Sequence, residues 1–174
     1  LGYMGRALAV RSAALGLQVV ACTRRGDRNA EGVEREYDII QMEAFLGRSD
    51  FLAVGLPMTE QTRNIIDAQA ISLMRPASYL INSSRGGIVD EEALELALKH
   101  QKILGAAIDV FENEPYSGSL TSLSNCLLTS HIGSCTYSCR VRMEQEALSD
   151  SLRWLRGEPL EQEVPQEQYS YQEA

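Results

Sequence analysis

Short apolar runs alternate with amphipathic stretches along most of the chain. We expect the apolar runs to form β-strands, at residues 17–23, 50–57, 78–84, 103–110 and 125–130. We expect helices at residues 6–15, 68–74, 91–102 and 137–156. Almost continuously apolar strands that alternate with helices predict a parallel sheet covered on both faces.

The residues at the ends of these helices support the assignment. Asp67 and Asp90 stand where an N-cap is needed, because their carboxylates can accept from the first backbone amides of a helix. Gly16 follows the first helix and is a typical stop signal. His100 comes at the end of the third helix, where we interpret it as a favourable C-terminal charge.

Polar groups gather where the predicted strands end. In parallel sheets flanked by helices, ligands bind beyond the carboxyl ends of the strands. Those ends read Thr23-Arg24-Arg25, Gly55-Leu56-Pro57, Asn82-Ser83-Ser84-Arg85, Asp109-Val110-Phe111-Glu112-Asn113-Glu114 and Ser130-His131. This rim of the sheet is therefore the candidate site.

Composition excludes several classes of function. The 174 residues carry a net charge of -8, which argues against a nucleic-acid partner. No apolar run approaches the ~20 residues that span a bilayer, so no membrane partner is expected. The four cysteines include no Cys-x-x-Cys pair and there are two histidines, so we expect no metal site. Reduced thiols in a cytoplasmic protein are the expected state.

The first five residues fit the last five places of Gly-x-Gly-x-x-Gly. Gly2 would let the backbone approach a pyrophosphate, and Gly5 would let the helix pack closely on the sheet. The backbone amides of Tyr3 and Met4 would bind the phosphates at the helix N-terminus. Two glycines three apart are a weak signal alone, and the strand that follows gives them weight.

The residue that reads the ribose is expected at the end of that strand, about 20 residues on. Thr23 stands there, followed by Arg24 and Arg25, so a carboxylate for the 2′-hydroxyl is missing. Guanidinium groups could hold a 2′-phosphate, which favours NADP. The alternative is a solvated turn whose arginines pair with Asp27, in which case NAD would also fit.

Three longer segments match one family. The segments "INSSRGGIVDEEALELAL", "GAAIDVFENEP" and "LTSHIGSCT" resemble the NAD-binding domain of D-isomer-specific 2-hydroxyacid dehydrogenases, and "LPMTEQTRNII" is similar to another stretch of it. The resemblance implies a Rossmann-type doubly wound parallel sheet and an NAD(P)-dependent oxidoreductase acting on a small 2-hydroxy or 2-keto acid. The last two of the three segments look closest to D-3-phosphoglycerate dehydrogenases, and Thr-Arg-Arg looks more like glyoxylate/hydroxypyruvate reductases.

The resemblance also implies roles for single residues. Arg85 would hold the substrate carboxylate and carbonyl oxygen, His131 would be the acid/base, and Glu114 would orient the histidine. Asp109 would accept from the nicotinamide carboxamide. Further cofactor contacts would come from Leu56, Pro57, Ser83, Ser84 and Gly133.

The chemistry agrees with these roles. Oxidation of a 2-hydroxy acid needs a base for the hydroxyl proton, and the pKa of histidine lies near working pH. Arginine offers a planar fork for a carboxylate. A buried carboxylate such as Asp109 needs a partner, and a ligand amide would supply one.

Plainer explanations exist for some of these residues. Arg85 could pair with Asp90, although its neighbours Gly86 and Gly87 suggest backbone kept clear for a ligand. Glu114, just before Pro115, could be an ordinary loop carboxylate. Ser130 and the Ser134-Cys135 pair depart from the family pattern around His131, which affects the nicotinamide side more than the acid/base role.

The family places a strand before the first glycine and a substrate-binding domain ahead of that strand. We therefore expect residues 1–158 to be a dinucleotide-binding domain that lacks its first strand, and 159–174 to be a tail leading toward the missing substrate domain. The family also implies a homodimer. A dinucleotide-sensing corepressor of the C-terminal-binding-protein type is an alternative function, and a catalytically inactive nucleotide-binding fragment is another.

Overall fold

The computed structural model describes residues 1–24, 30–161 and 163. The chain forms two compact units, residues 1–130 and residues 131–174, and each is described by itself.

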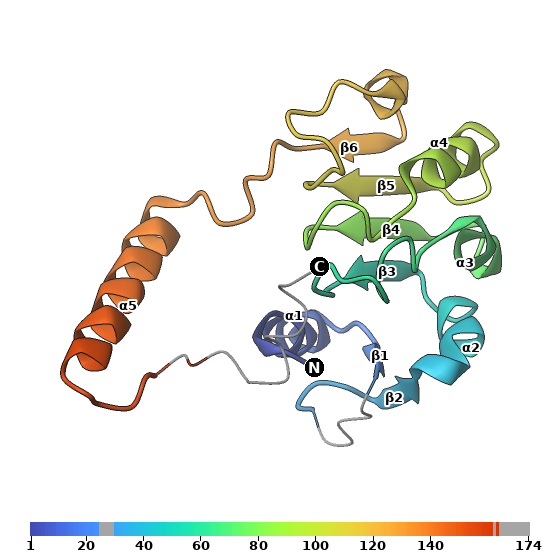
Figure 1. Ribbon diagram of the computed structural model, residues 1–174. Helices are drawn as coiled ribbons and strands as arrows, with labels where there is room; N and C mark the ends of the chain where they lie inside the picture. Colours follow the sequence, from blue (N-terminus) through green and yellow to red (C-terminus); the bar gives the residue numbers. More distant parts are fainter. Residues whose placement is uncertain (25–29, 162, 164–174) are drawn as a thin grey trace. The chain divides into compact units, whose positions relative to one another are not determined.

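The first unit alternates strands and helices, and the expected elements occur in the expected order, with further short elements between residues 35 and 46 (Figure 1). Its elements are α1 (Tyr3–Ala14), β1 (Val20–Thr23), β2 (Arg35–Asp38), η1 (Ile39–Gln41), α2 (Met42–Leu46), β3 (Phe51–Val54), α3 (Ala68–Leu73), β4 (Tyr79–Asn82), α4 (Glu91–Lys99), β5 (Gly105–Ile108), η2 (Ser119–Ser122) and β6 (Cys126–Leu128). All five expected strands are present, each shorter than its apolar run.

Every strand pair is parallel, as the pattern predicts. Among the described residues the strands form two sheets, β1–β2 and β3–β4–β5–β6. Figure 1 shows the four arrowheads of the larger sheet pointing the same way, so the carboxyl ends of these strands share one rim. The polar segments that follow them are therefore neighbours.

The core of the first unit lies on one face of the larger sheet. Leu52, Leu80 and Ile108 pack there with Ile71 of α3 and Leu94 of α4. This burial of aliphatic side chains drives the packing of the two helices on the sheet. The alternation of side chains along a strand sends the next residues to the opposite face.

The opposite face of the larger sheet is more exposed than the pattern predicts. Phe51 and Tyr79 are direct neighbours across β3 and β4, and their rings stack with centroids 5.5 Å apart. Phe51, Tyr79 and Leu127 are 56%, 40% and 66% exposed. We expected helices to cover both faces of the sheet. Within the described residues, one face is covered and the other is largely exposed.

The aspartate caps form as expected. The Asp67 carboxylate accepts from the Ala70 amide at 2.8 Å and begins α3, and the Asp90 carboxylate accepts from the Ala93 amide at 3.0 Å and begins α4. His100 is the C-cap residue of α4, close to its expected place. The caps fix where each helix starts relative to the strand before it.

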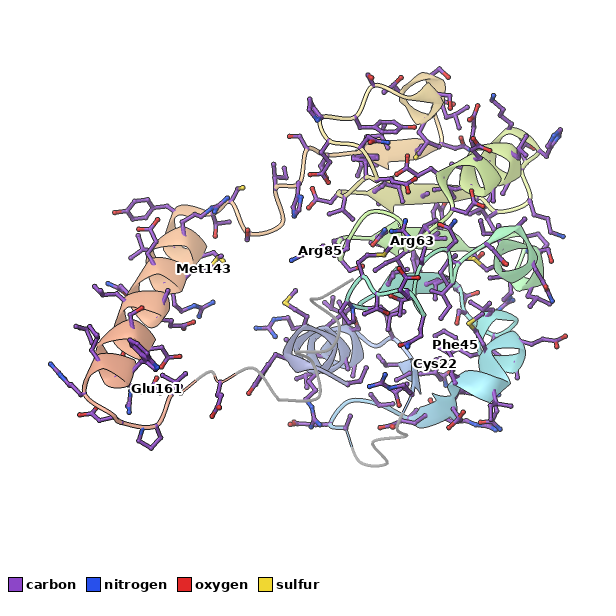
Figure 2. All side chains as sticks on the ribbon, viewed as in Figure 1. Cys22, Phe45, Arg63, Arg85, Met143 and Glu161 are labelled. Atoms are coloured by element: carbon purple, nitrogen blue, oxygen red, sulfur yellow. The ribbon has the colours of Figure 1, made fainter. Side chains whose placement is uncertain are left out.

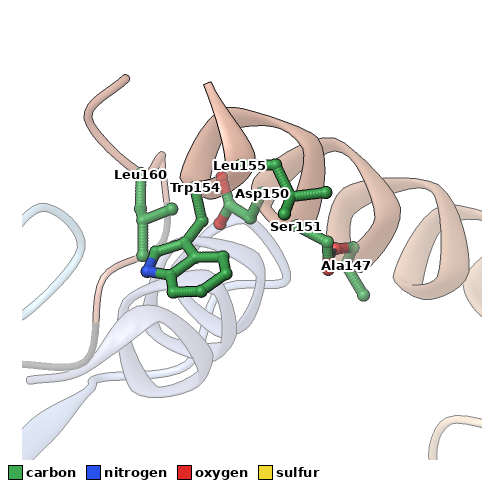
Figure 3. A pocket seen from close by; sticks show the side chains of 6 residues that line it. All are labelled: Ala147, Asp150, Ser151, Trp154, Leu155 and Leu160. Carbon is green, nitrogen blue, oxygen red and sulfur yellow. Dashed lines mark hydrogen bonds between the residues drawn. The ribbon is translucent and has the colours of Figure 1, made fainter. Parts of the chain in front are cut away.

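The second unit consists mainly of α5 (Tyr137–Leu155), which matches the predicted helix. The Thr136 hydroxyl accepts from the Cys139 amide at 3.3 Å and caps it. A shallow hollow at its carboxyl end is lined by Ala147, Asp150, Ser151, Trp154, Leu155 and Leu160 (Figure 3). It contains none of the predicted site residues. In the described part of the chain, no helix is both long enough and apolar enough to cross a membrane.

Candidate functional site

The loop after β4 is built on the side chain of Asn82. This residue is 2% exposed. Its side-chain oxygen Oδ1 accepts from the backbone amide of Ser84 at 3.1 Å and from the Ser84 hydroxyl at 2.8 Å. Its amide nitrogen donates to the Arg85 carbonyl at 3.0 Å. A buried amide whose two ends are both bonded fixes the loop in one conformation. The backbone that carries Ser84 and Arg85 is thereby held at the rim.

This loop lies directly against the loop after β5. A Cβ atom placed on Gly86 would lie 2.0 Å from the carbonyl oxygen of Phe111 and 2.5 Å from the amide nitrogen of Glu112. Only a glycine permits so close an approach of two backbones. Arg85 and Glu114 are thus brought onto adjoining loops.

The same contact corrects the sequence interpretation of the glycine pair. Gly86 is not kept clear for a ligand, because backbone fills the space beside it. Gly87 has a φ of +73°, which glycine adopts without strain, and an added Cβ would lie 3.2 Å from Cε of Met58.

A third loop, between β3 and α3, completes the rim. The Asn64 amide donates to the Gly87 carbonyl at 2.8 Å. The guanidinium of Arg63, which is labelled in Figure 2, donates to the Glu112 carboxylate at 3.2 Å. The loops 55–66, 83–89 and 109–114 therefore contact one another pairwise, and we call them the three-loop rim. The Arg63–Glu112 pair is more than half exposed, so it contributes about 0–1 kcal/mol.

The start of the third loop is held by two threonines. The Thr62 hydroxyl donates to the Pro57 carbonyl at 2.7 Å and accepts from the Thr59 amide at 2.8 Å. These bonds fix the backbone just after Leu56 and Pro57, the two cofactor contacts expected there.

The first turn of helix α4 also holds the loop after β5, through the side chain of Glu91. The Glu91 carboxylate accepts from the Glu112 amide at 2.7 Å. Burial raises the pKa of Glu91, and the nearby charges of Glu112 and Asp90 raise it further, while the bond from the Glu112 amide lowers it. The start of α4 and the loop after β5 are therefore fixed relative to one another.

Asp109 already has a protein partner. It is 8% exposed, and its carboxylate accepts from the Thr129 hydroxyl at 2.5 Å. The need of a buried carboxylate for a partner, which pointed to a ligand amide, is therefore met at least in part by Thr129. The bond also joins the ends of β5 and β6.

The three residues expected to carry the chemistry occupy different settings. The Arg85 guanidinium lies beyond β4 and donates to the Ser84 carbonyl at 2.7 Å (Figure 2). The Glu114 carboxylate accepts from the Phe111 amide at 2.9 Å. Both side chains belong to the three-loop rim. His131 is the first residue of the second unit, where its backbone has a φ of +55°.

The opening glycine motif begins α1 as expected. Gly2 is the N-cap in an extended conformation, and no side chain in the described part of the chain caps the helix. A Cβ on Gly2 would meet no atom of the described residues within 4 Å. This arrangement suits a phosphate bound to the first backbone amides, including those of Tyr3 and Met4.

Beside Gly5 lies the side chain of Leu1, which an added Cβ would meet at 2.9 Å. Close packing of Gly5 on the sheet stays a prediction. The close approach to α1 is made by Gly32, whose added Cβ would lie 3.0 Å from the backbone of Ala9 and Val10. Gly32 has a φ of +79°, so its conformation also favours glycine.

The ribose-side residues follow β1. Thr23 ends the strand and pairs in register with Asp38 of β2, and Arg24 follows it as an exposed residue. The Asp38 carboxylate accepts from the Ile40 amide at 3.0 Å and caps η1. Arg25 and Asp27 lie outside the described residues.

Several residues that hold the rim had no individual role in the sequence interpretation. Asn82 was noted only as part of a polar strand end, and Thr129, Thr62 and Glu91 were given no role at the site. The Thr-x-x-Thr spacing and the polar residue that ends an apolar strand are signals that could have identified Thr62 and Asn82. Among the described residues, no group of three or more His, Cys, Asp or Glu side chains is placed to bind a metal ion.

Comparison with known proteins gives one consistent family. Residues 1–133 match the sequence model of one family, the D-isomer specific 2-hydroxyacid dehydrogenase, NAD binding domain. The glyoxylate reductase of Thermococcus litoralis is 38% identical over 159 residues, which are 90% of this chain and 47% of that protein. Glyoxylate/hydroxypyruvate reductase B of Enterobacter agglomerans is 37% identical over 161 residues, covering 90% of this chain and 49% of that protein.

A solved structure agrees with these relatives. The NADPH-dependent glyoxylate/hydroxypyruvate reductase of Sinorhizobium meliloti, in complex with NADP and sulfate, superposes with a TM-score of 0.84 at 32% identity. The match covers 94% of this chain and 53% of that one. The chain spans about half the length of the curated relatives it matches.

Proposed function

Because the chain belongs to the D-isomer specific 2-hydroxyacid dehydrogenase family, through its NAD-binding domain, we propose that it serves hydride transfer between NAD(P) and a 2-hydroxy/2-keto acid pair. The observation that carries this proposal is the backbone contact at Gly86, which sets the loop of Arg85 against the loop of Glu114. An arginine and a carboxylate on adjoining loops at the carboxyl rim are what a 2-keto acid and its acid/base require.

His131 is proposed to complete this set. The resemblance of "LTSHIGSCT" to the family, in which the histidine is the acid/base, supports this role.

The residues present fit a dinucleotide. The first turn of α1, which no described side chain caps, would hold the pyrophosphate, and Thr23 with Arg24 and Arg25 would hold the ribose end. When bound, the nicotinamide supplies the redox step itself. Arg85 then binds and orients the acid, Glu114 orients the imidazole, and His131 holds or releases the proton at the substrate oxygen.

We propose NADP rather than NAD as the preferred nucleotide. A threonine in place of an acidic residue leaves a 2′-phosphate unopposed, and each charge-assisted bond from a guanidinium adds ~1.5–3 kcal/mol. One such bond corresponds to roughly tenfold to hundredfold preference. The NADP-bound relative at 32% identity supports this choice.

We propose glyoxylate or hydroxypyruvate as the acid, because the reductases of these compounds are 37–38% identical to this chain. The likeness of two segments to D-3-phosphoglycerate dehydrogenases makes 3-phosphohydroxypyruvate the substrate to compare.

Steady-state oxidation of NADPH and NADH by the full-length protein, with each of the three acids, tests the proposal. His131→Ala should lower kcat by ~10²–10⁴-fold, because proton transfer contributes that much, and should leave nucleotide affinity nearly unchanged. His100→Ala is the matched control, since His100 caps α4. Equal loss in both variants, or full activity in His131→Ala, would remove His131 from the mechanism. A preference for NADH that Arg24→Ala/Arg25→Ala does not alter would assign these arginines to a solvated turn.

A further inference from the structure

Two successive backbone amides of the loop after β5 each donate to a glutamate. The Phe111 amide donates to the Glu114 carboxylate at 2.9 Å, and the Glu112 amide donates to the Glu91 carboxylate at 2.7 Å. Glu114 belongs to the same loop, so its bond folds the loop on itself. Glu91 is the first residue of α4 and lies 21 residues before Glu112, so its bond joins the loop to a separate element.

The Glu91 side chain extends from a backbone segment that is itself fixed. The Ile66 amide donates to the Ile88 carbonyl at 3.2 Å, and the Asp90 amide donates to the Ile66 carbonyl at 3.1 Å. These bonds pair residues 88–90 with the end of the loop between β3 and α3, and Ile88 is completely buried. Asp90 also caps α4. Glu91 therefore reaches the loop after β5 from a rigid base.

The bond to Glu91 lies beside the closest backbone approach of the rim. The Glu112 nitrogen, which donates to Glu91, would lie 2.5 Å from a Cβ placed on Gly86. Contact between two backbones limits how near the loops can come but attracts them only weakly, because each pair of atoms gains little. A hydrogen bond to a carboxylate is stronger than one between neutral groups. The Glu91 bond therefore holds the Phe111–Glu112 peptide against Gly86.

The other link to Glu112 acts on its side chain. The Arg63 guanidinium donates to the Glu112 carboxylate at 3.2 Å, and both side chains are more than half exposed. Water screens such a pair, and the rotatable bonds of the Glu112 side chain lie between it and the backbone. Glu91 is half-buried and bonds the backbone directly. Glu91 is thus better placed than Arg63 to fix the path of the loop.

We propose that Glu91 is a positioning residue for Glu114. By binding the Glu112 amide, it keeps the loop after β5 seated on Gly86, and this fixes the Glu114 carboxylate relative to Arg85. The catalytic consequence rests on the proposed function, in which Glu114 orients the imidazole of the acid/base. Because small errors in the position of such a group cost much of its effect, a displaced Glu114 slows the reaction while Arg85 and the nucleotide-binding residues still hold their ligands.

Three variants separate the hydrogen bond from the charge. Glu91→Ala removes the acceptor, whereas Glu91→Gln keeps an acceptor oxygen on a side chain of the same length. Burial, and after it the carboxylates of Glu112 and Asp90, raise the pKa of Glu91 and outweigh the bond from the Glu112 amide. The site therefore does not favour the charge, and Gln should replace Glu. Glu92→Ala is the matched control, because Glu92 is an exposed carboxylate of the same first turn.

Amide hydrogen exchange, followed by NMR of the isotope-labelled full-length protein, tests whether Glu91 holds the loop. In Glu91→Ala the Glu112 amide should exchange roughly threefold to tenfold faster, as expected for the loss of one hydrogen bond. It should keep close to the wild-type rate in Glu91→Gln and in Glu92→Ala. Equal exchange of this amide in wild type and in Glu91→Ala would overturn the inference. Circular dichroism of each variant confirms that α4 is intact.

Steady-state kinetics of the full-length protein tests the catalytic consequence. Glu91→Ala should lower kcat roughly tenfold while the KM for NADPH stays within about twofold, and Glu91→Gln should recover most of the loss. If Glu91 acts through Glu114, adding Glu91→Ala to Glu114→Gln should lower kcat little further. Additive losses in the double variant, or an equal fall of kcat in Glu92→Ala, would overturn the positioning role.

Failure of this inference is distinguishable from failure of the proposed function. A full-length protein that reduces none of the three acids would overturn the proposed function. The exchange rate of the Glu112 amide does not depend on turnover, so it would still decide whether Glu91 holds the loop.

Discussion

At the scale of single residues, the three-loop rim depends most on the missing side chain of Gly86. A methyl group there would overlap the carbonyl oxygen of Phe111, since the distance would be 2.0 Å. The neighbour is backbone, so the clash is relieved only by separating the two loops. The residue therefore sets the spacing between Arg85 and Glu114 more than either side chain does.

We predict that Gly86→Ala destabilises the protein by about 1–3 kcal/mol, the usual cost of overpacking, and weakens turnover more than nucleotide binding. Gly55→Ala is the control, because a Cβ at Gly55 would meet nothing within 4 Å. Urea unfolding and steady-state kinetics measure the two effects. If Gly86→Ala matches Gly55→Ala in both, the close approach has no role in holding the rim.

The sequence was a better guide to which residues lie at the rim than to the residues that hydrogen-bond them. Arg85, Glu114 and Asp109 stand at strand ends because apolar runs stop there, and strand polarity alone brings them to one rim. The partners Thr129 and Glu91 are distant in sequence and are found only through the fold. Gly86 was recognised as special for the wrong reason, since a sequence does not say which backbone approaches a glycine.

At the scale of elements, the caps decide where helices begin. Asp90 both begins α4 and sets the position of Glu91, which bonds the loop after β5. The cap therefore affects the rim as well as the helix.

Asp90→Ala should cost about 1 kcal/mol, the usual value of a lost N-cap. Glu92→Ala is the matched control, because Glu92 is an exposed residue of the same first turn. Chemical denaturation compares the midpoints of the two variants. A loss in Glu92→Ala as large as in Asp90→Ala would mean that helix charge, and not the cap, is responsible.

The elements that the sequence missed are either polar or very short. β2 reads Arg-Glu-Tyr-Asp and buries Tyr37 alone, so it has no apolar run to reveal it. α2 is five residues long and follows a 3-10 turn, too short for a helical period. The long, strongly amphipathic elements were found with boundaries within a few residues.

At the scale of the whole molecule, stability is expected to depend on alkaline pH through Cys126. Its pKa is raised from 9.0 to about 11 by burial of its thiol in strand β6. The unfolded chain therefore loses this proton first as the pH rises. The stabilisation is fully present below pH 9.0 and is lost between there and about pH 11.

Cys126→Ala should flatten the decline in the free energy of unfolding across that range. Cys139→Ala is the control, with a half-buried thiol on the second unit. Denaturant midpoints measured at several pH values decide the matter. A decline of equal slope in wild type and in Cys126→Ala would assign the alkaline loss to other groups.

The Gly86 contact also bears on how such a site could be diversified. Main-chain atoms meet main-chain atoms there, so the contact carries no information about the side chains on either loop. A randomised library at Ser83 and Asn113, two exposed positions on these loops, would sample new recognition surfaces on an unchanged frame. Position 86 itself would return glycine from every round of selection.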